Sequence, residues 1–225
     1  MIEEKNTPIL DSEISVKEKF KTLSTKKKME FIYDYYKLPI IALLLGIIII
    51  SYMVYSIATK QDTYCNITYY GSNADSEELS TIKDTLNEKI LSDDKKSTIF
   101  IESIFVSPDS NYGDDPASTQ AFAVKLAANE IDILLINKNY FNYFASQDML
   151  LDLNSLPGFD SLNLTKNDLI MTKDHSGNEK LYGIKINNLN LLKDAIFDLD
   201  NTVLAIAISS QRNEQVLQVL KELTK

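Results

Sequence analysis

The chain has 225 residues, of which 44% are hydrophobic, and a formal net charge of −9. The charge is uneven, because residues 1–37 carry a net charge of +1 and residues 59–225 carry a net charge of −10. The acidic character of residues 59–225 argues against a nucleic-acid-binding protein, since binding to phosphates requires surfaces rich in Lys and Arg. The single cysteine, Cys65, excludes an internal disulfide.

Residues 1–37 form a lysine-rich arm without a core of its own. A weak helical stripe of Ile14, Phe20 and Leu23 precedes a cluster of lysines. One interpretation is a helix that binds a partner or anionic lipid. The other, which we prefer, is a juxtamembrane topology signal with a loose tail.

Leu38 to Ala58 is the predicted transmembrane helix, 21 residues without a charge. At about 1.5 Å per residue it spans roughly 30 Å, the thickness of a bilayer core. Pro39 is expected in the first turn, where a missing N–H costs little. Six lysines lie between residues 19 and 37, whereas only Lys60 follows closely. The positive-inside rule therefore predicts a single-pass cell-membrane protein with a cytoplasmic N-terminus, contacting lipid through residues 38–58 and placing residues 59–225 outside.

A cleaved signal peptide is the alternative to a retained anchor, since Ser56-Ile57-Ala58 weakly resembles a cleavage site. The apolar run is longer than a normal signal core, and the 37 residues before it are too many for a signal n-region. Both features favour the anchor. The residues before Cys65 do not form a lipobox, so Cys65 is expected to be a small buried side chain.

The first half of the outer portion alternates strands and helices. Residues 63–71 and 97–106 are rich in β-branched and aromatic residues and predict two strands. Between them, Asp75 opens a helix with an apolar face. Asp115 and Pro116 are typical of the start of a second helix, and Asn129 of its end, because Asn tolerates positive φ. The continuous apolar run 131–136 predicts a central strand covered on both faces, after which Asn137 or Asn139 caps another helix.

The second half predicts a hairpin over 169–186, with its turn at Ser176, Gly177 and Asn178. A short helix is expected over 189–197, a strand over 201–209 and a closing helix over 212–225. This order predicts a single doubly wound, mostly parallel α/β sheet. The expected organisation is a cytoplasmic arm (1–37), a transmembrane helix (38–58) and an extracytoplasmic α/β domain (59–225).

Two stretches resemble one lobe of bacterial extracellular solute-binding proteins of the type 2 periplasmic-binding-protein kind. They are STQAFAVKLAANEIDILLINKNYFNYFASQDMLLDL (118–153) and GIKINNLNLLKDAIFDLDNTVLAIAISSQRNEQVLQVLKEL (183–223). The family usually has Gly where this chain has Asn129. The juxtamembrane KKKMEFIYDYYKLPII (26–41) is similar to single-pass membrane proteins of low-GC Gram-positive bacteria. The resemblance implies a ligand-binding lobe, but the 167 residues after Ala58 hold only one lobe of about 100–150 residues.

No catalytic or metal-binding pattern stands out, so the chain is not expected to be an enzyme or to hold a cofactor. The only histidine, His175, lies in the predicted turn. The sequence has no G-x-S-x-G motif and no phosphate-binding Gly-rich loop. The acidic loop from Asp109 to Asp115 lacks the spacing of a calcium loop.

In open α/β sheets, ligands bind beyond the carboxyl ends of the parallel strands. The residues predicted at those positions follow four strands: Tyr70, Gly71, Ser72, Ser107, Asp109, Asn137, Lys138 and Ser209. For each of them, the alternative that we prefer is an ordinary helix cap or turn residue.

Two functions are compatible with these features. The first is a membrane-anchored extracytoplasmic binding module, an accessory to a membrane transporter. The second is a protein-interaction subunit of a membrane complex that binds no small molecule.

Overall fold

The computed structural model describes residues 21, 24–72, 74–107 and 112–225. It divides into two compact units, Met1–Lys60 and Gln61–Lys225. The apolar stripe expected at Ile14, Phe20 and Leu23 lies outside the described residues.

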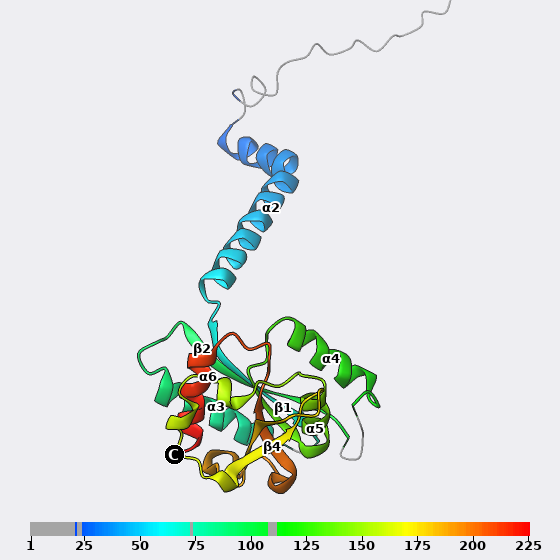
Figure 1. Cartoon of the computed structure of the whole chain (residues 1–225). Helices are drawn as coiled ribbons and strands as arrows, with labels where there is room; N and C mark the ends of the chain where they lie inside the picture. The colour runs from blue at the N-terminus through cyan, green and yellow to red at the C-terminus, as the bar shows by residue number, and fades with distance from the viewer. Residues whose placement is uncertain (1–20, 22–23, 73, 108–111) are drawn as a thin grey trace, which may run out of the picture. The chain divides into compact units, whose positions relative to one another are not determined.

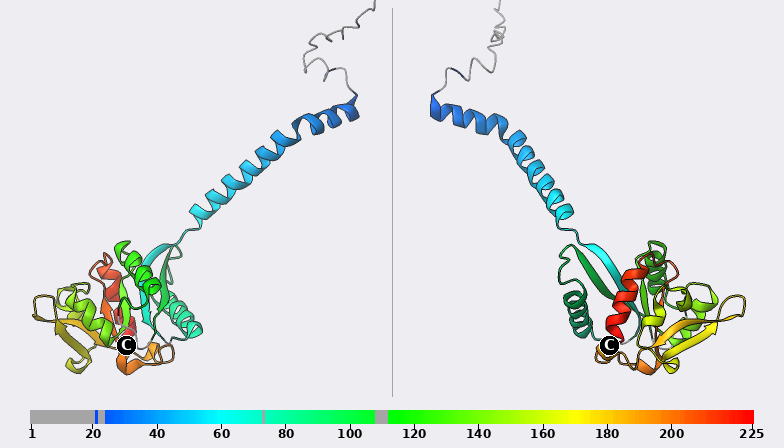
Figure 2. Two further views of the ribbon diagram at one scale, coloured as in Figure 1. Left: turned by 90° about the vertical axis from the view of Figure 1, so that its right-hand side faces the viewer. Right: turned by 60° about the vertical axis from the view of Figure 1, so that its left-hand side comes forward.

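The first unit contains one long helix, α2 (Thr25–Ala58). Its segment Lys37–Ala58 is long and apolar enough to cross a bilayer, by length and composition. The expectation for Pro39 was wrong, because the helix begins well before it and Pro39 lies in the helix interior. An internal proline removes a backbone hydrogen bond and clashes with the preceding turn. Figures 1 and 2 show α2 bending part-way along its length.

The second unit is built on a six-stranded sheet in the order β2-β1-β3-β6-β5-β4. The strands are β1 (Asp62–Gly71), β2 (Ser97–Phe105), β3 (Ile133–Asn137), β4 (Leu169–Lys173), β5 (Glu179–Lys185) and β6 (Thr202–Ile206). β1 pairs in parallel with both β2 and β3. β6 is antiparallel to β3 and β5, and β4 is antiparallel to β5. The sheet is therefore mixed: β1, β2, β3 and β5 share one direction, and β4 and β6 run the other way.

Helices cover both faces of this sheet, as Figure 1 shows. They are α3 (Ser76–Ile90), α4 (Pro116–Ala127), α5 (Lys138–Ser146) and α6 (Asn213–Leu223). One apolar core joins the sheet to α3 and α6, and a second joins it to α4 and α5. The expected three-layer α/β arrangement is confirmed.

The central strand β3 supplies side chains to both cores. Ile133 and Leu135 belong to the α3/α6 core, whereas Leu134 and Ile136 belong to the α4/α5 core. Successive side chains on a strand point to opposite faces. A continuous apolar run can therefore be buried only where both faces are covered.

The ends of α4 form as the sequence indicates. At the start, the Asp115 carboxylate accepts hydrogen bonds from two backbone N–H groups of the first turn. At the end, Asn129 has a left-handed φ of 56°. Its N–H donates to Leu126 O (3.1 Å), and the Glu130 N–H donates to Lys125 O (2.9 Å). These two bonds are those of a Schellman motif, which explains an Asn at this position.

The connections contain several short 3-10 turns: η1 (Leu153–Ser155), η2 (Phe159–Ser161), η3 (Lys166–Asp168), η4 (Asn190–Leu192) and η5 (Leu199–Asn201). The helix expected over 189–197 was wrong, since only η4 and a tight turn form there. Ile196 instead makes an isolated β-bridge with Ala74. Leu189, Leu192, Ala195 and Ile196 are buried in the core shared with α3 and α6 without forming a helix, whereas Phe197 is exposed.

The edge strand β2 is partly closed by α3. The Asn87 side chain accepts a hydrogen bond from Ile99 N (2.8 Å) and donates one to Ile99 O (3.1 Å). Ser118 Oγ likewise donates to Phe105 O (2.8 Å). Side chains that occupy edge N–H and C=O groups hinder pairing with another chain.

Candidate functional site

The turn between β4 and β5 is organised by one carboxylate. Asp174 Oδ1 accepts hydrogen bonds from Ser176 N and Asn178 N, both at 2.9 Å. Gly177 adopts a φ of 82°, which glycine tolerates without strain. The turn predicted at Ser176, Gly177 and Asn178 is thus confirmed, and Asp174 is the residue that shapes it.

Asp174 also forms an ion pair with Lys180, with Oδ2 3.0 Å from the Lys180 ammonium. The hydrogen bond from Lys180 lowers the pKa of the Asp174 carboxyl to about 2, and the bonds from Asn178 add to the effect. The pKa of Lys180 is raised by the same contact. Both groups are therefore charged at neutral pH.

The same turn contacts the segment that follows α5. His175 Nδ1 lies 2.7 Å from Asp148 Oδ2, and His175 N donates to Asp148 Oδ1 over 3.5 Å. Asp148 has a positive φ of 52°, a conformation that Asp tolerates better than most residues. Residues that are held in sparsely populated backbone conformations, as Asp148 is, are frequent at functional sites.

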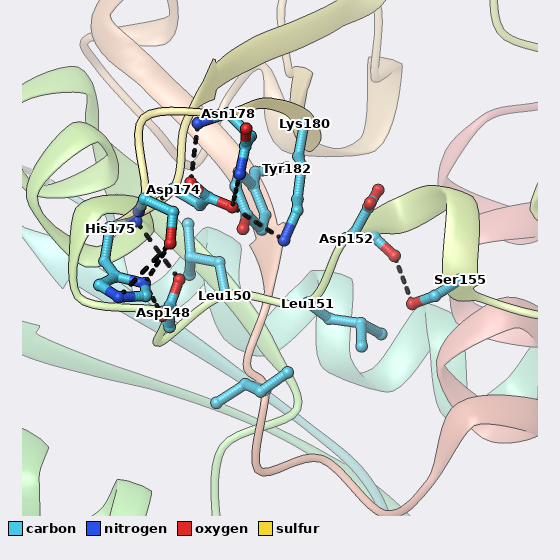
Figure 3. A pocket seen from close by; sticks show the side chains of 12 residues that line it. Asp148, Leu150, Leu151, Asp152, Ser155, Asp174, His175, Asn178, Lys180 and Tyr182 are labelled. Carbon is cyan, nitrogen blue, oxygen red and sulfur yellow. Dashed lines mark hydrogen bonds and ion pairs between the residues drawn. The ribbon is translucent and has the colours of Figure 1, made fainter.

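A surface depression lies between this hairpin and residues 148–155, with a volume of about 460 Å³. It forms because β5 pairs with β6 only over Gly183–Lys185. Past the end of this pairing, Ala207, the residue after β6, forms an antiparallel bridge with Leu150 instead of with β5. Figure 3 shows Asp174, His175 and Lys180 on one side of the depression and Asp152 and Ser155 on the other.

The lining combines charged groups with an apolar surface. Its carboxylates are Asp148, Asp152 and Asp174, and its apolar side chains are Leu150, Leu151 and Ile208. Tyr182 is only 2% exposed, and no described residue makes a hydrogen bond with its hydroxyl. Burial raises the pKa of that hydroxyl, so it remains a neutral donor. Such a surface can bind a small polar ligand through ionic and hydrogen-bonding contacts. Among the described residues, no group of three His, Cys, Asp or Glu side chains is placed to hold a metal.

The described residues predicted after β1 and β2 are at the carboxyl ends of these strands, on the opposite side of the sheet from this depression. Tyr70 is buried in an aromatic cluster, with its ring 5.0 Å from those of Phe122 and Tyr140. Burial raises its pKa to about 12. Gly71 ends β1, and an added Cβ there would meet the Tyr69 ring at 2.3 Å.

Ser72 is partly buried, and Ser107 is exposed. Asp109 lies outside the described residues. Asn137 caps α5, its side chain accepting a hydrogen bond from Tyr140 N at 2.9 Å. Lys138 is exposed in the first turn of α5.

The prediction that Ser209 lies beyond the carboxyl ends of the parallel strands was wrong. Because β6 is antiparallel to β3, Ser209 follows β6 at the amino end of β3 rather than at its carboxyl end. Its neighbour Ser210 donates a hydrogen bond to Asp132, just before β3, at 2.7 Å. Ser209 therefore lies on the side of the sheet where the depression is found.

The carboxyl edge near β1 is covered by residues 189–196. Asp75 N donates to Ala195 O (2.9 Å), and Ala74 bridges to Ile196. Leu189, Leu192 and Ile196 are all buried. Residues 189–196 therefore cover the carboxyl end of β1.

Sequence reasoning missed the residues of the depression. His175 and its neighbours were interpreted only as a turn, and residues 148–155 were given no role in a site. The one local signal is the run of polar residues from Asp174 to Asn178, whose position in space depends on contacts with Asp148 that are distant in sequence.

No protein-family model matches the chain, and no curated protein matches it. Two solved structures are similar to it in part. One is an extracellular solute-binding protein family 1 member from Alicyclobacillus acidocaldarius, with 16% identity and a TM-score of 0.33, covering 56% of this chain and 28% of that one. The other is an ABC substrate-binding protein from Listeria monocytogenes in complex with cycloalternan, with 17% identity and a TM-score of 0.32, covering 49% and 24%. The chain spans about a quarter of the length of these structures.

Proposed function

We propose that this chain is a membrane-anchored extracytoplasmic binding module that takes a small polar ligand in the depression between the β4–β5 hairpin and residues 148–155. The observation that carries the proposal is the depression itself. Its pairs Asp174–Lys180 and Asp148–His175 are preorganised, and the Tyr182 hydroxyl is free to bond a ligand. Preformed polar groups beside an apolar surface reduce the ordering cost of binding.

The membrane part of the proposal is supported by the apolar segment Lys37–Ala58 and the lysines before it. These features favour a cytoplasmic N-terminus, with the sheet on the outer side of the cell membrane. A module so placed meets ligands from outside the cell, and a membrane transporter is the partner that we propose for it.

A ligand screen on the full chain in detergent micelles tests the proposal. The chain has no tryptophan, so unfolding is followed by far-UV circular dichroism while sugars, short peptides and amino acids are added in turn. A ligand of the depression should raise the unfolding midpoint by mass action. Lys180→Met should remove the shift, because it removes the cation that faces the ligand.

Lys166→Met is the matched control, since Lys166 is exposed in η3 and lines no part of the depression. The control should keep the full shift. An equal shift in both variants, or no shift with any compound, would contradict binding in the depression.

A second function, a protein-interaction subunit without a small ligand, is favoured by the apolar side chains on the surface of the outer unit. Phe197 is 70% exposed and Phe105 is 64% exposed. Cross-linking in native membranes tests it: a partner lost with Phe197→Ser but kept with Met171→Ser, another exposed apolar side chain, would support this function.

A further inference from the structure

A second polar cluster lies near the amino end of β3, at the junction of α4, β3 and α6. Its centre is Asp132, which is fully buried. The Asp132 carboxylate accepts hydrogen bonds from Asn66 N (2.8 Å) and Ser210 Oγ (2.7 Å) and pairs with Arg212 Nη1 (3.1 Å). Arg212 Nη1 also donates to Asn129 O (3.2 Å). Asp132 thus contacts only Nη1 of the guanidinium, and the Nη2 and Nε atoms of Arg212 do not take part in this ion pair.

A cavity of about 270 Å³ lies beside this cluster, over the β1–β2 ribbon. Asn66, Glu102, Glu130 and Arg212 contribute to its walls. Asn66 and Glu102 are on the face of the sheet that α4 covers, where Lys125 of α4 lies 2.8 Å from the Glu102 carboxylate. The cavity is slightly smaller than the ~300–1,000 Å³ of sites for drug-sized ligands.

One wall of the cavity has an unsatisfied polar atom. Asn66 is 7% exposed, and its Oδ1 has no hydrogen-bond partner among the described residues. Its Nδ2 donates to Glu102 Oε1 at 3.0 Å, which settles which atom is the oxygen. A buried acceptor without a partner is costly, so such a group points to a donor that binds there.

Arg212 supplies a positive charge that can bind an anionic group of a ligand. Its Nη1 is the atom that bonds Asp132 and Asn129, and no described residue accepts a hydrogen bond from its Nη2 or Nε. These two donors form the fork that binds a carboxylate in bidentate fashion. The cavity therefore has a carboxylate-binding group and, at Asn66 and Glu130, groups that bind a cationic donor. Glu130 is only 3.9 Å from the Lys125 ammonium, which bonds Glu102 more closely at 2.8 Å.

We infer that this cavity binds a small zwitterion, a free α-amino acid or a ligand of similar size with both an ammonium group and a carboxylate. The ligand carboxylate pairs with Nη2 and Nε of Arg212. The ligand ammonium donates to Asn66 Oδ1 and pairs with Glu130. The cavity is distinct from the depression at Lys180, so the two sites can be tested separately.

Isothermal titration calorimetry of the full chain in detergent micelles tests the inference. Each common L-amino acid is titrated, and the tightest binder is compared with its N-acetyl derivative and with the amine that lacks its carboxylate. Both analogues should bind at least roughly 10-fold more weakly, because each loses one charged hydrogen-bonding group. Asn66→Ala and Glu130→Gln should each weaken the amino acid by a similar factor.

The controls separate this site from the rest of the molecule. Glu88→Gln makes the same change as Glu130→Gln on an exposed face of α3 and should leave the affinity unchanged. Lys180→Met should also leave it unchanged, because that residue belongs to the depression. Glu130 is exposed, so its variant remains informative even if Asn66→Ala does not fold. Absence of saturable heat, either analogue binding as tightly as the amino acid, or an unchanged affinity in Glu130→Gln would overturn the inference.

Discussion

Asn129 shows how one residue decides where a helix ends. Asn129 lies two residues past Ala127, the last residue of α4, and its positive φ and the two Schellman bonds end the helix there. Asn129→Gly should leave the stability unchanged or raise it slightly, because glycine adopts this φ freely. Asn129→Val should cost about 1 kcal/mol or more, because a β-branched side chain is strained there. Urea unfolding of both variants measures this, and equal midpoints would contradict the assigned helix end.

Asp174 should make part of the stability depend on acidic pH. Its folded pKa of about 2 lies below the value of about 3.9 expected when unfolded. A carboxyl with a depressed pKa stabilises the fold fully above its unfolded pKa, and that contribution is lost as pH falls towards the folded value. The urea midpoint should therefore drop between about pH 4 and pH 2, and the drop should be smaller in Asp174→Asn. Asp160→Asn, at an exposed position, should behave like the wild type; a wild-type-like drop in Asp174→Asn would refute the assignment.

At the scale of the element, β3 depends on cover from both sides. Ile133 and Leu134 are both fully buried, but in different cores. Ile133→Asp and Leu134→Asp should each unfold the unit Gln61–Lys225, since an unpaired buried carboxylate costs several kcal/mol and a domain has only about 5–15 kcal/mol of stability. Met171→Asp, on the exposed face of the edge strand β4, should fold normally. Circular dichroism melts compare the three, and a wild-type melt for either β3 variant would argue against a two-sided sheet.

At the scale of the whole molecule, the orientation in the membrane remains a prediction. Cys65 is fully buried and its thiol pKa is raised well above the usual value, chiefly by burial, so it should not react in the folded protein. A Cys65→Ser background with Ser176→Cys places a thiol in the exposed hairpin turn instead. A membrane-impermeant maleimide should label that thiol in intact cells. Thr25→Cys in the same background should be labelled only after permeabilisation, and the reverse pattern would invert the proposed topology.

The sequence by itself determined where most helices of the sheet unit begin and that its central strand is covered on both faces. Asp75, Asp115, Asn129 and Asn137 end or begin helices at the expected positions, because capping uses side chains next to the backbone groups that they satisfy. The apolar run of β3 implied two covered faces, and both are present.

Only the tertiary structure decided the direction of β6 and, with it, the location of the candidate sites. β5 and β6 are joined by residues 186–201, which contain 3-10 turns and no crossover α-helix, and the two strands pair as antiparallel neighbours. That pairing moved Ser209 to the amino end of β3, where it places Ser210 and Arg212 against Asp132. Contacts such as Asp148–His175 and Asp132–Arg212 join residues far apart in the chain. Strand direction and contacts of this kind depend on how the whole chain packs, because no local periodicity or capping preference encodes them.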